Sequence, residues 1–213
     1  MPAREQLLSE LTQENDFGVL LVTQMGGAPN ELQLVIETAE FDPVARGLRP
    51  RHAYAIRVLG EYEHRIQLGM FKRLAILDDH PLLYHTNTPR VAVHFDGKAA
   101  DINELALDIS QMYVSVFQNW RHLVDQEDDI NRTIPLIDLL KRGYGLLGTM
   151  PKPLAEKIGR VLAHHHVKFT LAEEVGFSAT DGKGRSQLAK VLLMDDSYFI
   201  ALDFSVEQMG VPR

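Results

Sequence analysis

An apolar stripe between residues 102 and 124 constrains the fold of this chain more than any other feature of its sequence. Large apolar side chains recur there at steps of three and four, the spacing of one helix face: Ile102, Leu105, Ile109, Met112, Val116, Trp120 and Leu123. Asp101 and Glu104 have the spacing of a capping box, in which Asp replaces the usual Ser or Thr. The pattern predicts a helix over residues 102–124, which needs an apolar layer to pack against.

The segment before this helix has a period of two, which is typical of β-strands. Apolar runs at 18–24 and 31–38 are joined by the turn-rich residues 25–30, so a hairpin is expected there. Further short runs follow at 53–59, 64–70, 74–77, 82–85 and 90–96. Because hairpin spacing leaves no room for crossover helices, we expect residues 18–96 to form an antiparallel β-meander of about six or seven short strands.

The remainder of the chain contains two more helix patterns and a final pair of strands. Residues 133–142 and 153–165 are expected to be helices, the first of which stops at Gly143. After a strand pattern at 167–173, the runs 188–194 and 198–206 flank a turn at Asp195-Asp196-Ser197, as in a hairpin.

These elements together predict the α+β fold class. The expected architecture is an antiparallel β-meander packed on a long amphipathic helix, followed by two shorter helices and a C-terminal β-hairpin. A mainly antiparallel β portion would occupy residues 1–97, and a helical portion ending in the hairpin would occupy residues 98–213. The two portions form a single domain if they share one sheet.

Composition excludes several classes of protein. The chain has 213 residues, 45% hydrophobic and 24% charged, which are ordinary values for globular proteins. The absence of cysteine excludes disulfides, thiolate nucleophiles and iron–sulfur clusters. A formal net charge of −7 argues against nucleic acid as a partner. No apolar run is long enough to span a membrane, and the polar first residues and lack of cysteine favour the cytoplasm.

Two glycine-rich segments resemble nucleotide-binding motifs only superficially. The run from Gly143 to Gly148 fits G-x-G-x-x-G, but it follows a helix ending in Lys141-Arg142 rather than a strand. We therefore interpret it as a helix C-cap and a joint between helices, and expect no cofactor. Residues 176–183 depart from the P-loop spacing, which leaves only a weak anion contact through Lys183 and Arg185.

The histidines supply the one candidate for metal chemistry. His80, His85 and His94 lie near Asp78, Asp79 and Asp96 in the sequence. Adjacent hairpin strands would bring His85, His94 and Asp96 together as a two-His, one-carboxylate set suited to zinc or iron. The alternative is a solvated sheet face with polar residues where alternation requires them, and this interpretation, with no bound metal, is preferred.

Two other polar groups have simple interpretations. His164, His165 and His166 point in different directions around one helix turn, so they cannot converge on a metal. A basic patch near Tyr54 and Arg57 would meet a phosphate or an acidic partner, although a solvated loop is favoured; its members are Arg46, Arg49, Arg51 and His52.

The preferred function is therefore that of a non-enzymatic module that binds a protein or a small-molecule ligand. The sequence lacks the local signatures of hydrolase nucleophiles and of zinc-protease helices. A homodimer is expected, because symmetric dimers are the commonest oligomers. The alternative function is a metal-dependent hydrolase with a site around His85, His94 and Asp96.

Overall fold

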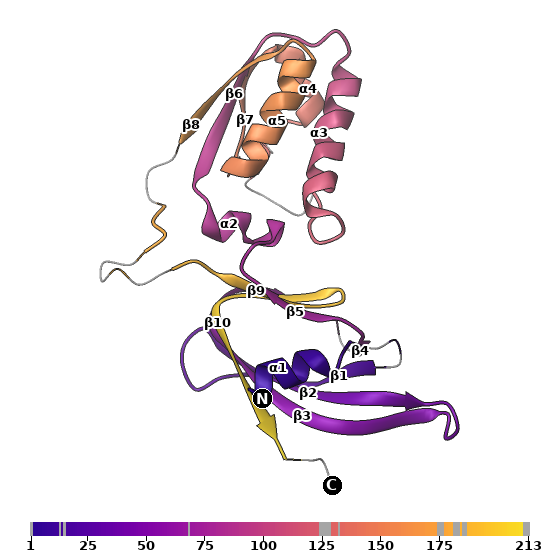
Figure 1. The fold of residues 1–213 in the computed structure, drawn as a ribbon. Coiled ribbons are helices and arrows are strands. Elements are labelled where there is room, and N and C mark those ends of the chain that lie inside the picture. The colour runs from indigo at the N-terminus through magenta and orange to yellow at the C-terminus, as the bar shows by residue number, and fades with distance from the viewer. Residues whose placement is uncertain are drawn as a thin grey trace. The chain divides into compact units, whose positions relative to one another are not determined.

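The computed structural model describes residues 2–12, 14, 16–67, 69–123, 129–131, 133–173, 177–180, 184 and 187–210. The chain divides into two compact units (Figure 1). The first unit comprises Met1–Asp79 and Ala189–Arg213, and the second unit comprises His80–Leu188. Residues 97 and 98, where the sequence suggested a division, lie in the loop after strand β6, within the second unit.

The first unit consists of one short helix and an antiparallel sheet of seven strands in the order β4-β1-β2-β3-β10-β9-β5. Because neighbouring strands in the first half are linked by short turns, β1, β2 and β3 form a meander, which β10 joins from the far end of the sequence. The elements are α1 Ala3–Ser9, β1 Asp16–Met25, β2 Glu31–Asp42, β3 Gly47–Arg65, β4 Met70–Phe71, β5 Leu74–Leu77, β9 Lys190–Met194 and β10 Ser197–Met209.

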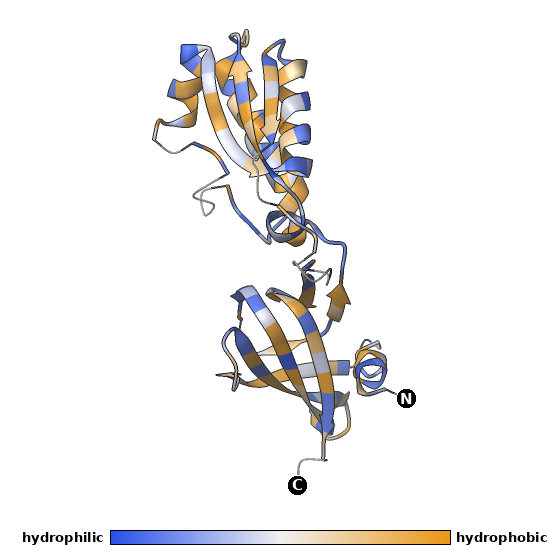
Figure 2. Ribbon diagram, turned by 90° about the vertical axis from the view of Figure 1, so that its left-hand side faces the viewer, coloured by the Kyte–Doolittle hydropathy of each residue, from blue (hydrophilic) through white to orange (hydrophobic). Residues whose placement is uncertain are grey.

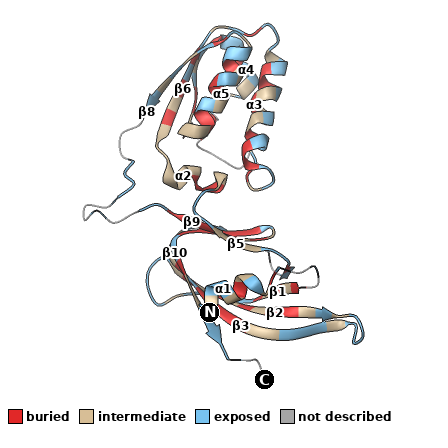
Figure 3. Cartoon of the chain, in the orientation of Figure 1, coloured by how far each residue is buried: buried red, intermediate tan, exposed pale blue. Residues whose placement is uncertain are grey.

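Alternation along the strands builds the core of the first unit. Figure 2 shows hydrophobic and hydrophilic residues alternating along its strands. On β2, Leu32, Leu34 and Ile36 are buried, while the residues between them are only half-buried. Leu7 of α1 and Leu11 just after it pack into the same core. Figure 3 shows buried segments along the strands of this unit. The helix thus fixes the N-terminal segment against the inner face of the sheet.

The sheet of the first unit curls so that its two outermost strands approach each other. β4 pairs with β1 and β5 pairs with β9, although only Lys72 and Arg73 separate β4 from β5. Asp195 in the β9–β10 turn accepts hydrogen bonds from the backbone amides of these two residues at 2.8 and 3.2 Å. The carboxylate therefore links the β9–β10 turn to the two residues between the outermost strands β4 and β5.

The second unit is a three-stranded antiparallel sheet of order β7-β6-β8 with helices packed on it. α5 packs against all three strands, and α3 packs against α5 and α4. The sheet and the helices share one core, which includes Val93, Ile109, Leu147 and Ile158. The elements are a short 3-10 helix η1 Pro81–Leu83, α2 Tyr84–Asn87, β6 Arg90–Asp96, α3 Ile102–Phe117, α4 Leu136–Arg142, β7 Tyr144–Pro151, α5 Lys152–His164 and β8 Lys168–Glu173.

The predicted fold class, a β-meander packed on a long helix, is wrong. The last predicted strand of the meander, β6, belongs to the second sheet, where it pairs with β7 and β8. The predicted long helix, α3, packs on other helices and ends at Phe117, seven residues early. Gln118 ends it with a φ of 52°, a left-handed value that breaks the helix. The apolar stripe indicated which side of α3 is buried but not which layer covers it.

Other local predictions also differ from the structure. Residues 82–85, expected as a strand, lie in η1 and α2, because Pro81 begins a 3-10 turn. The expected strands at 53–59 and 64–70 merge into the single long strand β3 as far as Arg65. Gly143 is the left-handed C-cap of α4, as predicted, with a φ of 82°. The glycine-rich residues after it form β7 rather than a joint between helices.

Several short-range predictions are confirmed. β1 and β2 form the expected hairpin, and β9 and β10 form the C-terminal hairpin around Asp195 and Asp196. The Asp101 carboxylate accepts the backbone N–H groups of Asn103 and Glu104, as the capping pattern indicated. In the part of the chain that the structure describes, no helix is long and apolar enough to cross a membrane.

Candidate functional site

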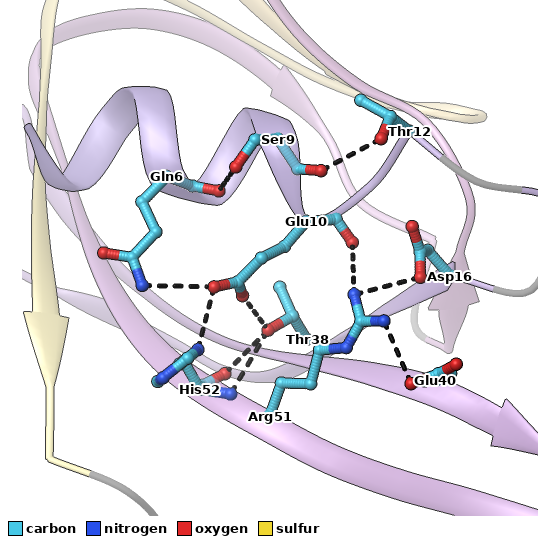
Figure 4. A network of polar contacts seen from close by, with 9 residues as sticks. All are labelled: Gln6, Ser9, Glu10, Thr12, Asp16, Thr38, Glu40, Arg51 and His52. Carbon is cyan, nitrogen blue, oxygen red and sulfur yellow. Dashed lines mark hydrogen bonds and ion pairs between the residues drawn. The ribbon is translucent and has the colours of Figure 1, made fainter. Parts of the chain in front are cut away.

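A β-bulge in β3 brings Arg51 and His52 to the same side of the sheet. Two residues of β3 lie opposite the single residue Thr38 of β2, because the pairing passes from Glu37↔Ala53 to Ala39↔Pro50. Consecutive residues of a regular strand point to opposite faces, whereas a bulge disrupts this alternation and re-aims a side chain. Both side chains therefore reach Glu10 at the C-terminal end of α1 (Figure 4).

Glu10 is the centre of the resulting network. Its side chain is 12% exposed. Its carboxylate accepts hydrogen bonds from Thr38 Oγ1 at 2.6 Å, His52 Nδ1 at 2.8 Å and Gln6 Nε2 at 3.2 Å. Burial by itself would raise the pKa of Glu10, but the hydrogen bond from Thr38 and the other contacts outweigh it and lower the pKa below its ordinary value. The carboxyl group is therefore ionised at neutral pH.

The ionised Glu10 determines how the His52 ring is oriented. A carboxylate only accepts hydrogen bonds, so the proton between the two groups belongs to His52 Nδ1. The backbone N–H of His52 also donates to Thr38 Oγ1 at 3.3 Å, while that hydroxyl donates to Glu10. Thr38 thus closes the bulge and supports the carboxylate at the same time.

Arg51 links the C-terminal end of α1 to β1 and β2. Its guanidinium lies 3.0 Å from Asp16 Oδ1 on β1 and 3.0 Å from Glu40 Oε2 on β2. It also donates to the backbone oxygen of Glu10 at 3.5 Å. Burial lowers the pKa of Arg51, but its contacts with Glu40 and Asp16 outweigh this effect and raise the pKa overall. The buried Asp16 thereby gains the paired charge that burial demands.

Tyr54 lies on the buried side of the site. It is fully buried two residues beyond His52, and the two rings meet edge to face with centroids 6.3 Å apart. Burial, with the nearby Glu10 carboxylate, raises the pKa of Tyr54 above its ordinary value, so the phenol keeps its proton. Its hydroxyl makes no hydrogen bond of standard geometry within the described residues.

The second ring nitrogen of His52, Nε2, is the candidate contact point of the site. The side chain is 32% exposed, and Nε2 makes no hydrogen bond with any described residue. In the neutral ring with the proton on Nδ1, Nε2 presents a lone pair that accepts a hydrogen bond. A carboxylate that orients one imidazole nitrogen and leaves the other open prepares histidine for binding a donor or for proton transfer.

His64 on the same strand offers a comparison. Its Nδ1 lies 2.9 Å from Glu61 Oε1, and its ring stacks on Phe199 with centroids 5.9 Å apart. This pair connects residues three apart in sequence, and the His64 side chain is 41% exposed. It therefore has the same nitrogen-to-carboxylate contact as His52 without the buried network around it.

The sequence-predicted metal site residues are not brought together. His85 lies on α2, where Nε2 is 3.0 and 2.9 Å from the two carboxylate oxygens of the buried Asp129. Tyr113 donates to the same carboxylate at 3.2 Å, and His85 Nδ1 is buried without a partner in the described part of the chain. This network faces the core of the second unit rather than solvent.

His94 and Asp96, the other two predicted ligands, are exposed on β6 opposite Thr170 and Lys168 of β8. His80 instead caps η1 by accepting the backbone N–H of Leu82. Among the described residues, no group of three or more His, Asp or Glu side chains is arranged to hold a metal ion. The metal-dependent hydrolase thus gains no support from these positions.

The remaining candidates fall in different places. His165 Nε2 pairs with Asp108 Oδ2 at 2.8 Å, which joins the end of α5 to α3. Of the basic patch, Arg46 and Arg49 are exposed near the β2–β3 turn. Lys183 and Arg185, suggested as an anion contact, lie outside the described residues.

Sequence patterns named Arg51, His52 and the neighbouring Tyr54 but missed the centre of the site. Arg51 and His52 were recognised only as part of a basic patch beside a loop. Their adjacency after Pro50 was a usable signal, because proline cannot donate to a ladder and is found at bulges. Glu10 gave no signal, since its partners lie 28 and 42 residues away in the chain.

Comparisons of the chain with protein-family models, with curated proteins and with solved structures found no match.

Proposed function

We propose that this protein is a non-enzymatic binding protein and that its first unit holds a small polar ligand at His52. The observation that carries the proposal is that the two nitrogens of the His52 ring have different surroundings. Nδ1 is fixed by Glu10 at 2.8 Å, whereas Nε2 makes no hydrogen bond with any described residue, and the side chain is 32% exposed. A preorganised acceptor binds its donor without the cost of ordering a mobile side chain.

The charges around His52 select the class of ligand. The network contains three carboxylates, those of Glu10, Asp16 and Glu40, and one guanidinium, that of Arg51. A net negative environment repels anions and attracts cations. The preferred ligand therefore presents a hydroxyl or ammonium donor and carries no negative charge.

Binding is favoured over covalent catalysis by what surrounds His52 Nε2. A nucleophilic enzyme places a hydroxyl or thiol within hydrogen-bonding distance of its histidine base. Within the described residues, no such group donates to His52 Nε2, and the Thr38 hydroxyl is already bonded to Glu10. The arrangement holds a donor but supplies no nucleophile of its own.

A titration monitored by nuclear magnetic resonance of the histidine rings tests the proposal. Ethanolamine, which carries both donor types, is added to the full chain at constant pH, and inorganic phosphate is added to a second sample. A His52→Gln variant assigns the His52 signals, and His64 in the same sample is the internal control. A saturable shift of the His52 signals is expected with ethanolamine. No saturable shift, an equal shift at His64, or a response to phosphate instead would refute it.

We also propose a cytoplasmic location, supported by the absence of cysteine from the chain. Fractionation of cells producing the natural protein tests this, with recovery in the cytosolic fraction expected. Recovery only from a secreted or membrane fraction would contradict it.

A further inference from the structure

β1 has an open edge over its second half. β2 pairs with β1 along its length, with a bulge between Leu20 and Val22. On the other side, β4 pairs only with Gly18 and Val19, and the Leu20 amide donates to the backbone oxygen of Gly69. Within the described residues, positions 21–25 therefore have no strand beside them on that edge.

The backbone groups that face this open edge can be identified from the hydrogen-bond alternation. Gly26 donates to the backbone oxygen of Glu31 at 2.7 Å, so its N–H points towards β2. In an antiparallel ladder, residues alternate between facing the partner strand and facing away from it. Val22 and Gln24 thus bond to β2, and the N–H and C=O groups of Thr23 and Met25 point outwards.

The side chains along the edge lack the usual protection against pairing. Leu21, Val22 and Met25 are 52%, 43% and 73% exposed. No charged residue and no proline occurs between residues 17 and 27. Edge strands of monomeric proteins are commonly protected by Lys, by Pro or by a covering element. The Thr23 hydroxyl is also buried with no hydrogen-bond partner in the described part of the chain.

We propose that this edge of β1 pairs antiparallel with the same edge of a second copy of the chain, centred on Thr23. A two-fold axis at Thr23 lets the two threonines exchange both backbone hydrogen bonds. It also places their side chains on the same face at cross-strand distance, where paired threonines hydrogen-bond. Two copies of a chain with a net charge of −7 approach most easily through an uncharged segment.

This register makes a specific pairing that substitutions can test. With the axis at Thr23, Val22 lies directly opposite Gln24 of the second copy. Val22 and Gln24 are both exposed, so changing them leaves the core of the first unit intact. The variant Val22→Lys/Gln24→Lys places like charges opposite each other twice across the axis. The variant Val22→Lys/Gln24→Glu places opposite charges there, and it serves as the matched control.

Sedimentation velocity of the full chain at micromolar concentration provides the measurement. The wild type and the Val22→Lys/Gln24→Glu variant are expected to sediment as dimers of the 24.0 kDa chain. The double-lysine variant is expected to dissociate, with a dimer constant weakened at least about tenfold. The two added lysines also reduce the net negative charge of each copy. Weaker general repulsion between the copies would therefore favour dimerisation of this variant, which is the opposite of the expected result. A monomeric wild type, or equal dimerisation of both variants, would overturn the proposal, whatever ligand His52 binds.

Discussion

The Nδ1 atom of His52 lies 2.8 Å from Oε1 of Glu10, which joins the middle of the first sheet to the end of α1. A carboxylate at the C-terminal end of a helix is disfavoured by the helix dipole. Here three hydrogen bonds to the Glu10 side chain compensate for that position. The same contacts fix the imidazole that the proposed ligand meets, so stability and binding depend on one carboxylate.

Replacing Glu10 with Gln is expected to destabilise the first unit by about 1–3 kcal/mol, because the amide cannot reproduce charged acceptor bonds to both Thr38 and His52. Urea denaturation followed by far-ultraviolet circular dichroism measures the change. Glu5→Gln, at an exposed position of α1, is the matched control and should stay within about 0.5 kcal/mol of wild type. Equal effects of the two substitutions would show that the network adds no stability.

The contribution of Glu10 to stability depends on pH in a defined direction. Its pKa is lower in the folded protein than its ordinary value, so the folded state favours the ionised form. The stabilisation is then complete above the ordinary carboxyl range, about pH 4.3, and is lost as the pH falls through the lowered pKa. The difference in unfolding free energy between wild type and Glu10→Gln should therefore shrink on acidification. A difference that is constant from neutral pH to about pH 3 would contradict this assignment.

Gly148 on β7 leaves no room for a side chain. A Cβ atom there would overlap the backbone carbonyl of Asp129, the residue whose carboxylate holds His85. Gly148→Ala should cost about 3 kcal/mol, because rigid backbone must move to relieve the overlap. Urea denaturation followed by far-ultraviolet circular dichroism, which reports unfolding of both units, measures the change. Gly27→Ala, where a Cβ meets nothing within 4 Å, should be nearly neutral. Equal stability of the two variants would exclude the close contact.

Local patterns in the sequence predicted the elements better than their packing. The start of α3 followed from Asp101, and both hairpins followed from their turn residues, because these signals act within a few residues. The assignment of β6 to a second sheet depends on partners at positions 144–151 and 168–173, which alternation does not identify. The long-range pairing of β10 with β3 was hidden for the same reason.

The candidate site was predictable only in part. His52 and Arg51 were visible as a polar pair, but strict alternation would have placed them on opposite faces. The bulge opposite Thr38 shifts the pairing by one residue and so brings both side chains to the same side of the sheet. The position of the bulge depends on both strands, and the sequence of β3 alone does not reveal it. Glu10 lies on a different element, so no spacing rule could connect it to His52.

The protonation of the His52 ring tests the central claim most directly. Nitrogen-15 resonance of labelled histidine, recorded at about pH 9 where imidazoles are neutral, distinguishes a protonated Nδ1 from a protonated Nε2. We expect that His52 carries its proton on Nδ1, bonded to Glu10, and that Nε2 has the signal of an unprotonated nitrogen. A proton on Nε2, or the averaged signal of a freely exchanging ring, would contradict it.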